Sequence, residues 1–309
     1  IGTNNFGEIS KLTKLVKPNI AIITNIGPTH LKFFKNINNI EKEKADIYNL
    51  KYNPEIKSII IPNYNKNNNY LFKKAKLNIN CDIITFGITN KANVYINNII
   101  KKNNSKFIVN AQIINKKLKY EISTTGEHQI LNSLITLSVF TILKLNLNNF
   151  VKYAPTLPKL SGRGRSYYLK INGKKITLID ESYNASPMSM EATIKYFEDY
   201  KNNNLNNKFL ILGDMLELGK KSKHYHCEIS KYLKRNYFYQ IVTCGSLIKN
   251  LYKYYNEKKI YHFENEIDLN KHILNNIQNN DVILAKASNE TPVNRFVHII
   301  SSISIKKLQ

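Results

Sequence analysis

The sequence predicts an α/β protein of two domains, and three observations support this fold class. The chain has 309 residues, more than a single small hydrophobic core usually organises. In the second half, apolar runs alternate with segments of helical periodicity, a pattern typical of a doubly wound, Rossmann-like parallel sheet. In the first half, helical segments and apolar runs lead into a cluster of short β-type runs, which indicates a mixed sheet with helices.

The first domain is expected to begin with helices and buried strands in alternation. Apolar residues at helical spacing, with Ile9, Leu12 and Val16 on one face, predict a helix that Pro18 ends. The next three segments predict a buried strand, a second helix and a second strand, over residues 19–25, 38–50 and 57–63.

From about residue 80 to residue 123 the pattern changes to short β-type runs separated by Asn, Lys and Gly, which predict partly antiparallel strands. A long helix is expected after residues 125–129. The stretch 148–165 contains two prolines and two glycines, which is typical of a domain boundary. We therefore expect one domain over residues 1–156 and a second over residues 157–309.

The second domain contains the regular alternation of strands and helices. Its predicted parallel strands are the apolar runs 174–182, 208–214, 239–245 and 281–288. Ligands of doubly wound sheets bind at the carboxyl ends of the strands. Those ends carry the polar or glycine residues Asp180, Glu181, Gly213, Asp214, Gly245 and Lys286.

The formal charge of +24 suggests nucleic-acid binding, but the composition favours a simpler explanation. The basic excess is spread along the chain and mixed with Asn, Ile and Tyr, while Trp is absent. An AT-rich genome would produce this bias through its codons. No zinc-finger, homeodomain or RNA-binding motif is present, so we expect no nucleic-acid partner.

The cysteine content and the hydropathy pattern predict a cytoplasmic protein. The three cysteines, Cys81, Cys227 and Cys244, are odd in number and lack metal-ligand spacing. The most apolar helical segment, residues 131–145, is too short to span a membrane and carries polar residues. No signal peptide is apparent.

A strand end and a nearby lysine form one candidate site. The segment TNIGPTHLKFF, residues 24–34, contains Asn25 and a single histidine, His30, and Lys44 follows among charged neighbours. A lysine ammonium cannot bind a metal, but a carbamylated lysine offers anionic oxygens that suit magnesium. From these residues alone, a structural histidine remains the simpler interpretation.

Three further motifs could bind a nucleotide, and each has a simpler alternative. Glu181 ends a strand before a helix, where a carboxylate can hydrogen-bond a ribose or cap the helix. Arg163 lies on a glycine-flexible loop, which suits either phosphate oxygens or solvent. His128 and Asn132 are four residues apart on one helical face, where the Asn amide could pair with an adenine edge or remain on the surface.

Together these motifs resemble the Mur ligase family. The matching stretches occur in family order and cover nearly the whole chain: IGTNNFGEI, ITNIGPTHLKFF, EKEKADIY, GEHQILNSL, SGRGR, LIDESYNASPMSMEA, LGDMLELGKKSKHYH and ILAKASN. The succession of DESYNASP and GDMLELG resembles most the members that add D-alanyl-D-alanine to UDP-N-acetylmuramoyl-tripeptide.

The resemblance implies an activity and an architecture. The fold would be part of the central ATP-binding domain followed by the C-terminal domain of a Mur ligase. The reaction would be an amide ligation that uses ATP and Mg²⁺, proceeds through an acyl phosphate and serves peptidoglycan precursor synthesis. We expect the enzyme to be a monomer.

The resemblance also implies roles for individual residues. His30 and Lys44 would be catalytic and, with Lys44 as a carbamate, would hold the second magnesium ion. The implied ATP contacts are Asn132 and His128 for adenine, Arg163 for the phosphates and Glu181 for the ribose. The implied residues of the substrate cleft are Asn25, Tyr183, Asn184 and Lys286.

The sequence also departs from the family pattern. The phosphate-binding loop G-T-x-G-K-[ST] does not occur, because GTNNFG at residues 2–7 lacks the lysine and the hydroxyl residue. The domain that holds the UDP group is not apparent either. We therefore expect the chain to be the C-terminal portion of a ligase, without ligase activity by itself.

Alternative functions remain open from the sequence. Another Mur ligase or a folylpolyglutamate synthase would share the fold and the acyl-phosphate chemistry. A non-catalytic remnant that acts as a scaffold would explain the missing phosphate loop. A nucleic-acid binder would show steeply salt-dependent affinity for DNA.

Overall fold

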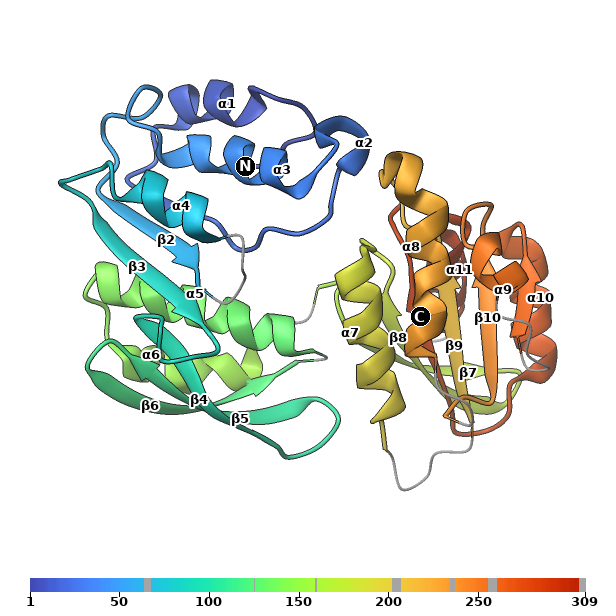
Figure 1. Ribbon diagram of the computed structural model, residues 1–309. Coiled ribbons are helices and arrows are strands. Elements are labelled where there is room, and N and C mark those ends of the chain that lie inside the picture. Colours follow the sequence, from blue (N-terminus) through green and yellow to red (C-terminus); the bar gives the residue numbers. More distant parts are fainter. Residues whose placement is uncertain are drawn as a thin grey trace. The chain divides into compact units, whose positions relative to one another are not determined.

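A computed structural model describes residues 1–63, 68–124, 126–158, 160–201, 207–233, 237–254 and 260–305. The chain divides into two compact units, residues 1–157 and 158–309 (Figure 1). Each unit has its own six-stranded sheet and its own hydrophobic cores. Among the described residues, every helix is too short or too polar to span a bilayer.

Unit 1 contains a mixed sheet in the order β1-β2-β3-β4-β5-β6, which confirms the predicted class. Strands β1 to β4 pair in parallel, and β4, β5 and β6 form antiparallel hairpins. Its elements are α1 (Glu8–Val16), β1 (Ile20–Ile22), α2 (Leu31–Phe34), α3 (Ile37–Ala45), η1 (Asp46–Tyr48), β2 (Ser58–Pro62), α4 (Asn68–Ala75), β3 (Asp82–Gly87), β4 (Val94–Lys101), β5 (Lys106–Ile113), β6 (Lys116–Ser123), α5 (Glu127–Ile142), α6 (Leu147–Tyr153) and η2 (Ala154–Thr156).

Strand β2 is buried along its whole length, and its apolar residues Ile59, Ile60 and Ile61 face helices on both sides of the sheet. Ile60 packs in the core that α5 and α6 cover, together with Leu134 and Phe150. Ile59 and Ile61 point the other way, into the core formed with α3, η1 and α4. Figure 1 shows α3 and α4 on the side of β2 opposite to α5.

Unit 2 is a doubly wound sheet in the order β11-β10-β9-β12-β8-β7, which confirms the predicted architecture. All strand pairs are parallel except β7 with β8. Its elements are β7 (Arg165–Ile171), β8 (Lys174–Glu181), α7 (Pro187–Glu198), β9 (Lys208–Gly213), η3 (Gly219–Lys221), α8 (Ser222–Glu228), η4 (Ile229–Tyr232), β10 (Gln240–Cys244), α9 (Lys249–Tyr254), β11 (Ile260–Phe263), α10 (Glu266–Asn276), β12 (Asp281–Lys286) and α11 (Pro292–Ile305).

Helices cover both faces of this sheet. Residues of α7 and α9 pack with Leu210 and Leu284 in one core, and residues of α10 and α11 pack with Phe209 and Ile283 in the other. The four predicted strands are β8, β9, β10 and β12. The two strands that the sequence did not predict, β7 and β11, are the edges of the sheet.

Candidate functional site

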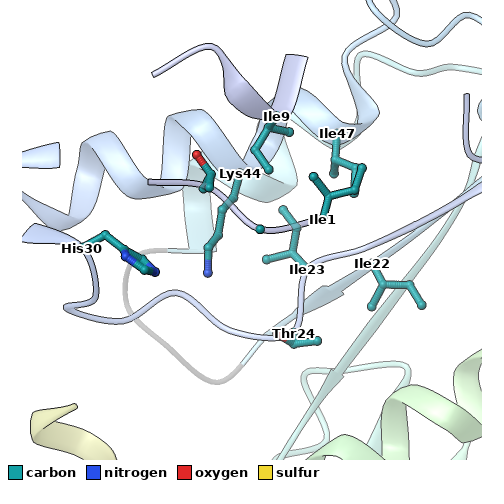
Figure 2. A pocket seen from close by; sticks show the side chains of 10 residues that line it. Ile1, Ile9, Ile22, Ile23, Thr24, His30, Lys44 and Ile47 are labelled. Carbon is teal, nitrogen blue, oxygen red and sulfur yellow. The ribbon is translucent and has the colours of Figure 1, made fainter. Parts of the chain in front are cut away.

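A cavity of about 170 Å³ in unit 1 contains the first candidate site. Its polar lining residues include Thr3, Thr24, His30 and Lys44, which lie among isoleucines of the β1 end and of α1 (Figure 2). The segment after β1 carries Thr24 and His30, and the last turn of α3 carries Lys44. Three segments that are distant in sequence therefore meet at one cavity.

Lys44 is held by the chain that follows β1. Its Nζ donates a hydrogen bond to the main-chain oxygen of Asn25 at 3.0 Å. Burial lowers the pKa of the Lys44 ammonium, because the charged form loses hydration. A lysine in such a place has a larger neutral fraction, and the neutral amine is the form that can act as a nucleophile.

His30 is the N-cap residue that precedes α2 and has a left-handed backbone conformation, with φ 54°. A residue other than glycine in this conformation is uncommon and costs conformational energy. Figure 2 shows the imidazole and the Lys44 amine directed into the same space. The structure thus brings His30 and Lys44, which the family resemblance assigns to one metal site, to the same cavity.

Glu43, which was not predicted as a site residue, links the N-terminal segment to α3 through hydrogen bonds. Its carboxylate accepts hydrogen bonds from the main-chain N–H groups of Gly7 and Ile9, at 2.8 and 2.9 Å, and from Thr3 Oγ1 at 3.4 Å. The side chain is buried. Glu43 thereby sets the position of the segment whose Thr3 lines the cavity beside Lys44. In the sequence it is one of several alternating charges, so no local signal distinguished it.

In unit 2, Asp180 organises the loop that precedes β7. Its Oδ2 accepts a hydrogen bond from Gly162 N at 2.7 Å, and its Oδ1 accepts from Ser182 N at 3.0 Å and Ser182 Oγ at 2.7 Å. The main-chain oxygen of Asp180 also accepts from Gly164 N. The buried carboxylate therefore joins the glycine-rich loop to the segment that follows β8.

Arg163 and Tyr183 form an exposed pair on these two segments. The guanidinium carbon of Arg163 lies 4.5 Å from the centre of the Tyr183 ring. A guanidinium over an aromatic face is attracted by the ring and is held in a restricted orientation. The Tyr183 ring thus restricts the orientation of one arginine of the glycine-rich loop.

Glu181 and Lys286 form a buried pair at the carboxyl ends of β8 and β12. The two residues are partners in the parallel register, and Lys286 Nζ lies 3.6 Å from Glu181 Oε2. Lys286 Nζ also donates to the main-chain oxygen of Asn184 at 2.7 Å. Burial lowers the pKa of Lys286, and the Glu181 carboxylate opposes that shift.

The carboxyl ends of β9 and β10 are filled by the chain itself. Asp214 Oδ1 accepts hydrogen bonds from Leu247 N at 3.0 Å and from Ile248 N at 2.7 Å. A Cβ at Gly245, where φ is 126°, would lie 2.6 Å from this carboxylate. These N–H groups could bind an anion, but the Asp214 carboxylate already accepts their hydrogen bonds. The polar groups at the β8 and β12 ends are the better candidates for ligand binding.

Comparison with known families identifies both units. The family model described as Mur ligase middle domain matches residues 1–140, and the model described as Mur ligase, glutamate ligase domain, matches residues 164–289.

The chain belongs to the Mur ligase family. It is 31% identical over 292 residues to a UDP-N-acetylmuramoyl-tripeptide–D-alanyl-D-alanine ligase from Buchnera aphidicola, a match that covers 93% of this chain and 60% of that protein. The chain therefore spans less than two thirds of the length of this curated relative.

Solved Mur ligase structures share the fold. MurF from Acinetobacter baumannii superposes with a TM-score of 0.83 and 22% identity, covering 98% of this chain and 64% of that one. MurF from Thermotoga maritima in complex with ADP gives a TM-score of 0.78 and 20% identity, covering 98% and 66%.

Two residues expected at adenine from the Mur ligase resemblance lie on α5. Asn132 is exposed there and is not among the residues that line the cavity of His30 and Lys44. The side chain of His128 lies outside the part of the chain that the structure describes. Gln129, beside His128 on this helix, accepts a hydrogen bond from Thr124 Oγ1 at 2.7 Å.

Proposed function

We propose that the protein is an ATP-dependent amide ligase that joins D-alanyl-D-alanine to UDP-N-acetylmuramoyl-tripeptide. The observation that carries this proposal is the relative of that name, with which 93% of the chain aligns at 31% identity. The solved neighbour from Thermotoga maritima is a complex with ADP, which supports the choice of nucleotide. We assign the reaction to the cytoplasm, where ATP is available.

The chemistry would proceed in two transfers. The γ-phosphoryl group of ATP passes to the substrate carboxylate and forms an acyl phosphate with release of ADP. The amine of the dipeptide then attacks the acyl carbon, and inorganic phosphate leaves. Preorganised positive groups lower the barrier of the first transfer because negative charge accumulates on the transferred oxygens.

In this proposal residues of unit 2 contribute to nucleotide binding. Arg163 would bind phosphate oxygens, since its planar guanidinium can donate two parallel hydrogen bonds. Glu181 would accept a hydrogen bond from a ribose hydroxyl. Tyr183 and Asn184, whose side chains are exposed on the loop after β8, would contact the substrates.

The cavity of unit 1 fits a magnesium ion if Lys44 is carbamylated. Within the described residues no group of three His, Cys, Asp or Glu side chains could hold a metal by itself. His30 would supply one ligand nitrogen, and a Lys44 carbamate would supply anionic oxygens in the same cavity. The lowered pKa of Lys44 favours the neutral amine, which is the form that reacts with carbon dioxide. When bound, the ion would neutralise phosphate charge.

The test uses the native gene product, purified through a C-terminal tag from cells that express the gene from its own locus. We expect ATP-dependent formation of the UDP-linked pentapeptide from the tripeptide precursor and D-alanyl-D-alanine. Lys44→Ala should lower kcat at least about 100-fold, because positioned charge contributes on that order to such transfers. A ¹³C carbamate signal from labelled bicarbonate should be lost in the same variant.

The control panel offers UDP-N-acetylmuramate with L-alanine, and a folate with glutamate. Product from either pair, without product from the tripeptide pair, would assign the protein to a neighbouring ligase. No ATP-dependent product from any pair would support a non-catalytic protein.

A further inference from the structure

Lys286 is a deeply buried cationic group at the candidate nucleotide site. It is the last residue of β12 and is 4% exposed. Its partner in the parallel register is Glu181, the last residue of β8. The pairing of two central strands therefore determines the position of Lys286, and no loop needs to become ordered for the lysine to reach it.

Two polar contacts hold the Lys286 amine, and both lie inside unit 2. Nζ donates to the main-chain oxygen of Asn184 at 2.7 Å and lies 3.6 Å from Glu181 Oε2. Burying an ammonium is costly unless it is paired and hydrogen-bonded. The Lys286 amine therefore remains paired with these two groups. One is the Glu181 carboxylate at the end of β8, and the other is the Asn184 main-chain oxygen in the loop that follows β8.

The loop that Lys286 holds is also the support of Arg163. Asn184 follows Tyr183, and Tyr183 N donates to Gly162 O at 3.2 Å. Tyr183 is 49% exposed, and its ring lies beneath the Arg163 guanidinium. A continuous set of contacts thus runs from the buried amine through the loop to the exposed arginine.

We propose that Lys286 is a positioning residue that acts on the nucleotide through Glu181 and through the Tyr183–Arg163 pair, without touching a substrate itself. This inference rests on the proposed function and changes the expected role of Lys286 from a contact in the substrate cleft to a support. Removing the amine would release Asn184 and leave the Glu181 carboxylate buried without its cation.

The first experiment compares steady-state kinetics of Lys286→Met with the wild-type native gene product. We expect kcat/KM for ATP to fall about tenfold, the order of one lost charge-assisted hydrogen bond. In an Arg163→Ala background, the effect of Lys286→Met on ATP should shrink, because the part that passes through Arg163 is already lost, while the part that passes through Glu181 remains.

The matched control is Lys208→Met. Lys208 also donates from Nζ to two main-chain oxygens, those of Phe197 and Glu198, both at 2.9 Å, but it lies at the amino end of β9. This variant should lose stability while its KM for ATP stays unchanged. Tyr183→Leu should raise the KM for ATP, as Lys286→Met does. Because the Tyr183 side chain is exposed, this variant should fold normally.

Hydrogen exchange tests the structural step without any activity. Backbone amides of residues 182–186 should exchange faster in Lys286→Met than in the wild type, and Lys208→Met should leave them unchanged. Unaltered exchange, or additive effects of Lys286→Met and Arg163→Ala on ATP, would overturn the inference. A wild type without ligase activity would overturn the proposed function instead, while the exchange result would still decide the role of Lys286 in the loop.

Discussion

Gly162 illustrates how strongly the candidate nucleotide site depends on one residue. Its φ is 73°, and a Cβ at this position would lie 2.5 Å from the Cβ of Tyr183. Its N–H donates to the buried carboxylate of Asp180. The loop can therefore neither shift away from Tyr183 nor accept a methyl group without losing a buried hydrogen bond. The position of the adjacent Arg163 follows from this restriction.

We predict that Gly162→Ala lowers the free energy of unfolding by about 3 kcal/mol, through left-handed backbone strain and overpacking together. The control is Gly173→Ala, where φ is 82° and nothing lies within 4 Å of the added Cβ. That variant should lose only about 1 kcal/mol, from the backbone term alone. Urea unfolding followed by far-UV circular dichroism measures both, and equal losses would contradict the role of Tyr183.

At the scale of elements, the connection between β9 and α8 is closed by a buried histidine. Met215 N donates to His226 Nε2 at 3.0 Å, so the other nitrogen, Nδ1, carries the proton and donates to Ser222 O at 2.7 Å. His226 is fully buried, and burial lowers its pKa below the ordinary value of 6.5. The folded chain therefore holds this ring neutral.

This neutral histidine makes stability depend on pH. The unfolded chain takes up the proton near pH 6.5, before the folded chain does, so stability falls as the pH drops below about 6.5. His226→Gln keeps an acceptor for Met215 N but cannot be protonated. Between pH 7.5 and 5.5 this variant should therefore lose less stability than the wild type. The difference between the two proteins should be at most about 1.4 kcal/mol per pH unit.

The loss should not vanish, because burial also lowers the pKa values of His262 and His272. Urea midpoints at the two pH values measure the effect. The same change of midpoint in the wild type and in His226→Gln would show that another group is responsible.

Helix α1 shows where periodicity is insufficient. The spacing of Ile9, Leu12 and Val16 predicted the helix itself, which the structure contains, but it did not predict which of its residues are buried. Ile9 and Thr13 are buried, whereas Leu12 and Val16 are 38% and 60% exposed. The buried face was decided by Glu43, which binds Gly7 N and Ile9 N and so sets the rotation of the helix.

At the scale of the whole molecule, the chain is two units, each with cores of its own. Phe86 is fully buried in the core of unit 1 that α5 covers, and Phe209 is fully buried in a core of unit 2. A cavity in either core removes contacts within that unit. The stability of each unit should therefore respond to its own substitutions.

We predict that Phe86→Ala destabilises residues 1–157 by about 3–5 kcal/mol, and that Phe209→Ala does the same to residues 158–309. Hydrogen exchange followed by mass spectrometry reports both units in one sample. Each variant serves as the control for the other. Loss of protection in both units from either substitution would mean that the chain unfolds as one cooperative body.

Much of the candidate site was accessible from sequence because its residues occur in recognisable local patterns. A strand end before a turn made Asn25 and His30 candidates, and a strand end before a helix made Glu181 a candidate, while the roles expected of them came from the family resemblance. The roles of Glu43 and Asp180 were not predicted, since each acts on segments distant in sequence. The edge strands β7 and β11 were missed because edge strands lack a continuous apolar run.

The sequence by itself determined the α/β class, the four central strands of unit 2 and the family, because apolar periodicity and ordered motifs are local properties of the chain. Only the tertiary structure decided that Lys44 meets His30 at one cavity, that Asp214 fills the β9 and β10 ends, and that Lys286 is committed to Glu181 and Asn184. These outcomes depend on sheet order and register, which bring distant polar groups within hydrogen-bonding distance. A buried polar group must then take the partners that the fold places beside it.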